Sequence, residues 1–263
     1  MIGGTEPTVR TWSRPVKKHL IDAWRTLFPA PGDRHGPLPS VLIWLTVVSG
    51  LVDAVSYLLL GHVFVANMTG NVVFMAFALV GVDGFSLSGT FAASVVALGA
   101  FGVGAVYGGR MVNRHSDHRG RLMLSVTAAE AVLFLAAYLV WLLAATPGSG
   151  WCRYLLIVLL GLGMGAQNAA VRRLGVPDLT TTVLTMTIAG IAADGRLAGG
   201  ADSKLGRRAL SAAAIFVGAL GGGLLAVHAS KSLPMLVAAL IAAAAAARLS
   251  GHARSTEPWT KLP

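Results

Sequence analysis

The sequence predicts an all-α, multi-pass integral membrane protein, and three observations lead to this prediction. Only 12% of the 263 residues are charged, whereas soluble domains carry roughly a quarter. Several apolar runs approach the roughly 20 residues that an α-helix needs to cross a bilayer. The basic residues, which give a net charge of +10, fall in the tails and between the apolar runs. Such a distribution is typical of cytoplasmic loops beside anionic lipid headgroups, so we expect no nucleic acid partner.

Residues 1–37 are polar and basic and are expected to form a cytoplasmic tail. Apolar side chains recur there at steps of three and four, with basic side chains at other positions around the same turns. Ser13 can cap a helix that has Pro15 in its first turn, where proline is tolerated. The pattern predicts an amphipathic interfacial helix that binds anionic lipid headgroups. A helix packed on the protein's own cytoplasmic loops is the alternative.

Residues 38–249 are the expected transmembrane domain, and 250–263 a short cytoplasmic tail. The apolar segments of this domain cover residues 40–60, 63–82, 88–109, 122–146, 154–172, 178–193, 209–229 and 233–248. The second segment contains asparagine, threonine and glycine, and the sixth is short and rich in threonine. Both are therefore expected to be broken or re-entrant helices that do not cross the membrane.

The positions of the basic regions favour the same topology. Basic residues cluster in both tails, between the third and fourth segments, and between the sixth and seventh. If all four regions are cytoplasmic, an even number of crossings must separate each pair. Eight full spans break this rule, whereas about six transmembrane helices plus two re-entrant segments satisfy it. Both termini are then cytoplasmic.

Under this topology the chain contains two similar units, at about residues 40–114 and 154–230. Each unit has a span, a polar break and a second span. Asp53 and Asn168 correspond by their distance from a preceding glycine, and the two units enter the membrane from opposite sides. Inverted repeats with interrupted helices are a known plan of membrane transporters, whose site lies at the repeat interface near the midplane.

Asp53 is the sharpest candidate for function because it lies inside an apolar span. A carboxylate there costs several kcal/mol unless it is paired, hydrated or protonated. It shares a helical face with Tyr57. One hypothesis is a proton or cation site coupled to a solute, and the other is a structural acid bonded to a neighbouring helix end or to Asn67. Glu130, in the fourth segment, is either a second proton site or an acid close enough to the headgroups to be hydrated, and we favour the second interpretation.

The polar breaks supply further candidates. The run Asn67-Met68-Thr69-Gly70-Asn71 combines two amides, a hydroxyl and a flexible glycine, which can bind a ligand or merely satisfy the broken backbone. The second unit offers uncharged donors and acceptors that suit a polar, neutral or zwitterionic solute, but its threonines can equally bond only their own helical backbone. The candidate residues for binding a substrate or ion are Asp53, Tyr57, Asn67, Thr69, Gly70, Asn71, Gln167, Asn168, Thr181, Thr182 and Thr185.

Motifs of enzymes and cofactor sites are missing from the sequence. It has no Walker loop, no dinucleotide glycine fingerprint and no His-Glu-x-x-His motif. The single cysteine, Cys152, excludes an intrachain disulfide and a cysteine-based zinc cluster. We therefore expect no enzymatic activity, no cofactor and no metal.

Four short runs resemble the YoaK-like family of uncharacterised bacterial multi-pass membrane proteins. They are residues 52–57 (Val-Asp-Ala-Val-Ser-Tyr), 64–71 (Phe-Val-Ala-Asn-Met-Thr-Gly-Asn), 163–169 (Gly-Met-Gly-Ala-Gln-Asn-Ala) and 178–182 (Asp-Leu-Thr-Thr-Thr). The similarity covers approximately residues 40–250. It implies a protein of the bacterial cell (inner) membrane and supplies no substrate, mechanism or catalytic residues.

Two functional hypotheses follow. The first is a carrier or channel for a small polar solute or ion, linked to protons through Asp53. The alternative is a non-transporting membrane sensor, scaffold or subunit of a larger membrane complex, which the basic N-terminal helix and the small-residue helix faces favour. A homo-oligomer is compatible with both hypotheses.

Overall fold

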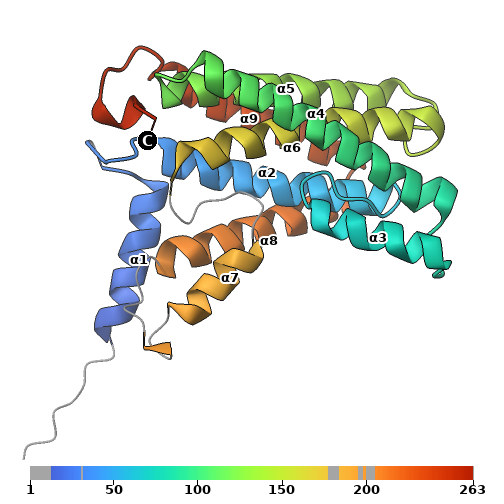
Figure 1. Ribbon diagram of the computed structural model, residues 1–263, viewed down its shortest axis with the longest axis horizontal. Helices are drawn as coiled ribbons and strands as arrows, with labels where there is room; N and C mark the ends of the chain where they lie inside the picture. Colours follow the sequence, from blue (N-terminus) through green and yellow to red (C-terminus); the bar gives the residue numbers. More distant parts are fainter. Residues whose placement is uncertain (1–12, 31, 177–183, 195–197, 200–204, 263) are drawn as a thin grey trace, which may run out of the picture.

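The computed structural model of the chain describes residues 13–30, 32–176, 184–194, 198–199 and 205–262 (Figure 1). The regular elements within these ranges are all helical. They are α1 (Ser13–Leu27), α2 (Leu38–Leu59), α3 (Met68–Val80), the π-helical turn η1 (Leu87–Phe91), α4 (Ala92–Arg114), α5 (Arg119–Leu143), α6 (Gly150–Leu174), α7 (Leu184–Ala193), α8 (Leu205–His228), α9 (Leu233–Ser250) and the 3₁₀ turn η3 (Pro258–Thr260).

Six helices in the described part of the chain are long and apolar enough to cross a membrane. They are α2, η1 continued by α4, α5, α6, α8 and α9. In Figure 1 these helices run side by side along the long axis of the molecule. The prediction of an all-α multi-pass membrane protein with about six transmembrane helices is confirmed.

The two segments expected to be broken lie on short helices. Helix α3 has 13 residues, so it extends only about 20 Å, against a hydrocarbon core of about 30 Å. It lies toward the end of the bundle where α2 ends, whereas α7 lies toward the end where α8 begins (Figure 1). Helix α7 has 10 residues, and the first part of the sixth segment, residues 178–183, lies outside the described residues.

Helix α1 lies across one end of the bundle, roughly perpendicular to the long helices (Figure 1). It packs on the first turn of α8 so closely that a side chain at Gly206 would collide with the backbone carbonyl of His19. Leu20, Trp24 and Phe28 remain exposed, at 64%, 63% and 58% of their surface. The predicted amphipathic helix therefore packs on the protein itself and still presents an apolar surface outward.

Helices α2 and α8 cross at very short distance because glycines remove the side chains between them. A Cβ atom at Gly50 of α2 would collide with the carbonyl oxygen of Ile215. In return, a Cβ atom at Gly218 of α8 would collide with the carbonyl oxygen of Val47. The two backbones thus touch directly, as in other small-residue crossings of membrane helices.

Helices α4 and α6 cross in the same way. A Cβ atom at Gly165 of α6 would collide with the carbonyl oxygen of Phe101, and one at Gly104 of α4 with the carbonyl oxygen of Leu162. These two crossings join the first half of the bundle to the second.

The C-terminal segment, residues 251–262, folds back over the beginning of α5. Trp259 is only 3% exposed and packs against Gly36, ahead of α2. His118 accepts the N–H of Arg121 at Nδ1, 3.1 Å, so its Nε2 carries the proton that is donated to the carbonyl of Ser255 at 3.0 Å. The expected polar tail is therefore docked onto the bundle through one tryptophan.

Candidate binding site within the membrane

A cavity of about 420 Å³ lies beside the crossing of α2 and α8. Its lining comes from α2, from the segment before α3 and from α8. The residues are Ser49, Gly50, Asp53, Ala54, Tyr57, Leu58, Phe64, Asn67, Ile215, Ala219 and Gly223. Three of the residues that the sequence singled out, Asp53, Tyr57 and Asn67, thus share one cavity.

Asp53 lies on α2, in the second half of the helix, and its carboxylate holds the non-helical segment that precedes α3. Its Oδ1 accepts the backbone N–H groups of Val65, at 2.9 Å, and Ala66, at 2.7 Å. Hydrogen bonds to a carboxylate are stronger than those between neutral groups. Asp53 therefore organises the break in the chain and lines the cavity at the same time, so both hypotheses for this acid keep a physical basis.

Asn71 and Gly70 shape the wall of the cavity through Phe64. Asn71 is fully buried; its Oδ1 accepts the N–H of Phe64 at 2.8 Å, and its Nδ2 donates to the Phe64 carbonyl at 2.7 Å. A Cβ atom at Gly70 would lie 2.6 Å from the Phe64 ring. Neither residue lines the cavity. Their contacts are those expected if this part of the motif satisfies the broken backbone.

Asn67 and Thr69 have exposed side chains. Asn67 precedes the first residue of α3, yet its side chain makes no capping hydrogen bond. Its amide is therefore available to the cavity that it lines, next to the positive end of the α3 dipole. Thr69 is not among the lining residues.

Tyr57 lies in an aromatic cluster at the end of α2. Its ring stacks on Phe64, with 5.3 Å between centroids, and contacts the His62 ring edge-on at 5.1 Å. The Phe74 ring packs nearby, at 5.9 Å. These neighbours pack around the ring of Tyr57, which lines the same cavity as Asp53.

In the second unit, Gln167 reaches the cavity indirectly. It is fully buried in α6, and its Nε2 donates to the hydroxyl of Ser49 at 3.2 Å. Ser49 lines the cavity and also donates to the carbonyl of Leu45 at 3.0 Å. Gln167 therefore sits one side chain behind the cavity wall and joins α6 to α2.

The remaining candidates do not line this cavity. Asn168 donates from Nδ2 to the carbonyl of Met164 in its own helix, at 2.8 Å. Thr185 has an exposed side chain on α7. Thr181 and Thr182 lie outside the described residues, so the structure does not place them.

Sequence reasoning missed two features. The small residues Ala54, Ala219 and Gly223 leave the space that forms the cavity, and the only sequence signal for them is spacing that is equally typical of helix packing. Glu130 was expected near the headgroups, but the structure buries it completely, close to Gly163 of α6. It lies outside the lining of the cavity.

Comparison with known proteins places the chain in a family. Residues 41–247 match the family described as "Protein of unknown function (DUF1275)". The chain belongs to this family. It is also 36% identical, over 162 residues, to the "UPF0700 transmembrane protein YoaK" of Bacillus subtilis (strain 168); the match covers 60% of this chain and 68% of the relative. No solved structure matches the chain. The resemblance to YoaK-like membrane proteins is thereby confirmed.

Proposed function

We propose that the protein is a carrier or channel for a small polar solute, with protons or cations moving through Asp53, and that it is not an enzyme. The observation that carries the proposal is the shared cavity, in which Asp53, Tyr57 and Asn67 meet beside the α2–α8 crossing. Carboxylates inside a membrane span are costly and commonly mark ion or proton paths. The membrane is taken to be the bacterial inner membrane, with both termini in the cytoplasm.

The lining of the cavity indicates the chemistry of the solute. One carboxylate, one free amide and two hydroxyl groups lie among apolar walls. A solute with an amine or hydroxyl donor can use Asp53 as an acceptor, and Asn67 and Tyr57 can bind a second polar group. A bare carboxylate inside a bilayer needs a counter-charge or a proton. Binding of a cationic or protonated partner would therefore accompany binding of the solute.

We further propose that the two units at about residues 40–114 and 154–230 form an inverted repeat, and the helix crossings support this. Gly50 meets α8 as Gly165 meets α4, and Gly218 meets α2 as Gly104 meets α6. Both crossings therefore pair a glycine of one unit with the backbone of the other, as a two-fold axis in the membrane plane requires. Transporters of this plan bind their substrates at the interface between the repeats.

Helix α1 is consistent with an orientation that has both termini in the cytoplasm. The exposed Leu20 and Trp24 of α1, with Phe28 directly after the helix, give an apolar face across the end of the bundle, and Arg25 occupies the last turn. An amphipathic helix of this kind can insert its apolar face at the level of anionic headgroups. We propose that α1 rests on the cytoplasmic leaflet.

The variant Asp53→Asn tests the proposed coupling. Its side-chain oxygen can still accept the N–H groups of Val65 and Ala66, so the break should persist while the charge is lost. Asp83→Asn is the matched control, because Asp83 is exposed in the loop after α3. We expect flux, or its dependence on pH, to fall roughly tenfold or more in Asp53→Asn only.

The assay is uptake by proteoliposomes that contain an internal pH dye, challenged with amines, amino acids and polyols at two external pH values. Normal, pH-dependent flux in Asp53→Asn would reject the role of the acid. A wild-type protein that moves none of these solutes and co-purifies with one defined membrane protein would favour the sensor or scaffold hypothesis instead.

A further inference from the structure

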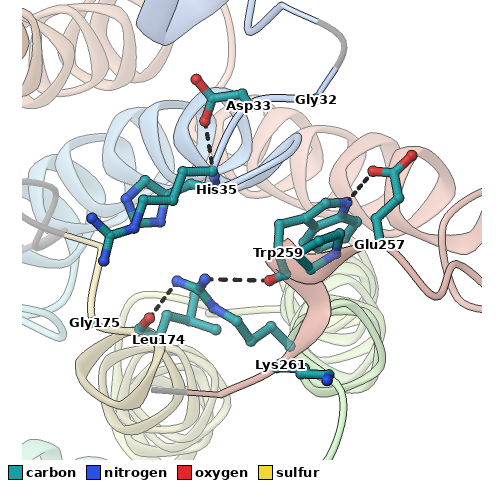
Figure 2. A pocket seen from close by; sticks show the side chains of 11 residues that line it. Gly32, Asp33, His35, Leu174, Gly175, Glu257, Trp259 and Lys261 are labelled. Carbon is teal, nitrogen blue, oxygen red and sulfur yellow. Dashed lines mark hydrogen bonds between the residues drawn. The ribbon is translucent and has the colours of Figure 1, made fainter.

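A second cavity, of about 540 Å³, lies at the end of the bundle where α2 and α5 begin and α6 ends. Figure 2 shows its walls: the loop with Asp33 and His35 on one side, the α6 end at Leu174 and Gly175 below, and the C-terminal segment with Glu257, Trp259 and Lys261 opposite. It shares no lining residue with the Asp53 cavity. Asp53 lies 16 residues after Pro37, which precedes α2, so it is roughly 24 Å from this end of the bundle at a rise of 1.5 Å per residue.

Arg119, the first residue of α5, is the unusual group in this cavity. Its side chain lines the cavity but is only 5% exposed. Two of its nitrogens donate to backbone carbonyls: Nη1 to Trp259 at 3.3 Å, and Nη2 to Leu174. Its Nε is buried and has no hydrogen-bond partner among the described residues. A guanidinium held by neutral carbonyls keeps its full charge, and burying such a charge is costly unless an anion joins it.

The other charged groups do not neutralise Arg119 within the described residues. Glu257 accepts the indole N–H of Trp259 at 2.6 Å, and Asp33 accepts the backbone N–H of His35 at 2.8 Å. Within the part of the chain that the structure describes, Arg119 forms no ion pair. Arg34 and Lys261 add two further cations to the lining. The cavity thus holds more positive than negative charge.

The pKa of His35 responds to the same positive charges. Its Nδ1 is buried and finds no hydrogen-bond partner in the part of the chain that the structure describes. Burial lowers the pKa of His35 below its ordinary value, and the positive charges of Arg119, Arg207 and Arg34 lower it further, against a smaller opposing effect of Asp33. An anion in the cavity would counter these charges and raise the pKa of His35. Protons and the anion would therefore bind together.

We propose that this cavity is a binding site for a phosphate-type anion, either a soluble phosphate ester or the phosphate of a lipid headgroup. Arg119 supplies the buried donor, and Arg34 and Lys261 complete the charge around it. Arginine suits phosphate because its planar N–H groups match the phosphate oxygens. The beginning of α5 adds the positive end of a helix dipole. The position at the ends of membrane helices puts the cavity at the level where lipid phosphates lie.

The test uses the full-length protein and separates the two sources of phosphate. Calorimetric titration of the protein in neutral detergent with inorganic phosphate and with glycerol phosphate tests the soluble source. Native mass spectrometry after exchange into phosphatidylglycerol or phosphatidylcholine nanodiscs tests the headgroup. Arg119→Gln and Arg34→Gln are the test variants. Arg121→Gln is the matched control, because Arg121 lies two residues farther on and bonds the carbonyl of Ala253 without lining the cavity.

We expect one of these probes to bind the wild type and the Arg121→Gln control, with affinity reduced roughly tenfold in Arg119→Gln and severalfold in Arg34→Gln. The phosphodiester of phosphatidylglycerol keeps one negative charge across this pH range, so its binding should tighten as the pH falls through the pKa of His35 in the complex, and His35→Gln should remove this dependence. If Arg119→Gln does not fold, Arg34→Gln and Lys261→Gln decide, because both side chains line the cavity and can be changed without touching Arg119. Asp53→Asn should leave binding unchanged, which keeps this test independent of transport.

Retention of phosphatidylglycerol, lost in the cavity variants, would assign the headgroup, and binding of glycerol phosphate alone would assign a soluble ester. The proposal is overturned if no probe binds. It is equally overturned if binding is the same in Arg119→Gln, Arg34→Gln and the control.

Discussion

The crossing of α2 with α8 and that of α4 with α6 share a backbone arrangement and differ in their chemistry. Both are closed by glycines that meet a carbonyl of the facing helix. Three residues after the glycine, the first crossing has Asp53, whose carboxylate holds the segment before α3. The second has Asn168, which bonds a carbonyl of its own helix.

The surroundings of the two crossings differ as well. The cavity beside α2 and α8 is lined by an acid and an aromatic hydroxyl. A cavity of about 530 Å³ beside α4 and α6 is lined instead by Arg172 and Arg173, which are exposed at the end of α6. The comparison teaches that the same glycine contact brings the two backbones together in each crossing, while the neighbouring residues carry an acid beside one crossing and cations beside the other.

The largest effect is expected from alanine at the crossing glycines. In Gly104→Ala and Gly218→Ala the new methyl group meets a backbone carbonyl that cannot rotate away, so each should destabilise the fold by about 3 kcal/mol, the upper end of overpacking costs. Thermal or denaturant unfolding in detergent measures this. Gly102→Ala and Gly221→Ala lie on the same helices with open space around the added methyl group and should be neutral or stabilising. If Gly104→Ala and Gly218→Ala lowered the unfolding free energy by clearly different amounts, the two crossings would not be equivalent.

A smaller effect is expected at the break before α3, which shapes only the first crossing's cavity. Asn71→Ala removes both hydrogen bonds to Phe64 and leaves buried backbone groups unpaired, so it should cost about 2 kcal/mol. Thr69→Ala, in the same motif but exposed, should change the unfolding free energy by less than about 0.5 kcal/mol. The same unfolding assay compares them. If Asn71→Ala and Thr69→Ala changed the unfolding free energy equally, the buried asparagine would have no special role in holding the break.

The smallest effect on stability is expected for Asn67→Ala, because its side chain makes no capping bond. Its unfolding free energy should stay within about 0.5 kcal/mol of the wild type. Solute flux in proteoliposomes should nevertheless fall, since the amide lines the cavity. Unchanged flux at every solute concentration would remove Asn67 from the proposed site and leave Asp53 and Tyr57.

Much of the fold could be predicted because lipid imposes strong rules. Apolar length and the positions of basic residues led to six spans, and the polar run at Asn67–Asn71 marked the break. The fourth apolar segment was expected over residues 122–146, whereas helix α5 already begins at the buried Arg119. Its burial depends on the carbonyl of Trp259, which is remote in sequence. Local patterns carry no information about such a partner.

The site was predicted in part for the same reason. An acid in an apolar span is conspicuous, and helical spacing puts Tyr57 on its face. The sequence could not separate Asn67, which lines the cavity, from Asn71, which holds the backbone of Phe64. The two asparagines have the same chemistry, and only the path of the chain before α3 decides which one is buried. The space between α2 and α8 likewise depends on a contact between distant helices.

The hydrogen bonds that shape the break have a consequence for how the protein is made. They join Asp53 to Val65 and Ala66, and Phe64 to Asn71, and in each pair the two residues are at most 13 positions apart. Closing such short loops costs little entropy. Gly50, by contrast, meets Ile215 only after α3 to α7 have been synthesised. During synthesis the hairpin of α2 and α3 can therefore take its shape on its own, and the acid is already tied down before the helix that completes its cavity has left the ribosome.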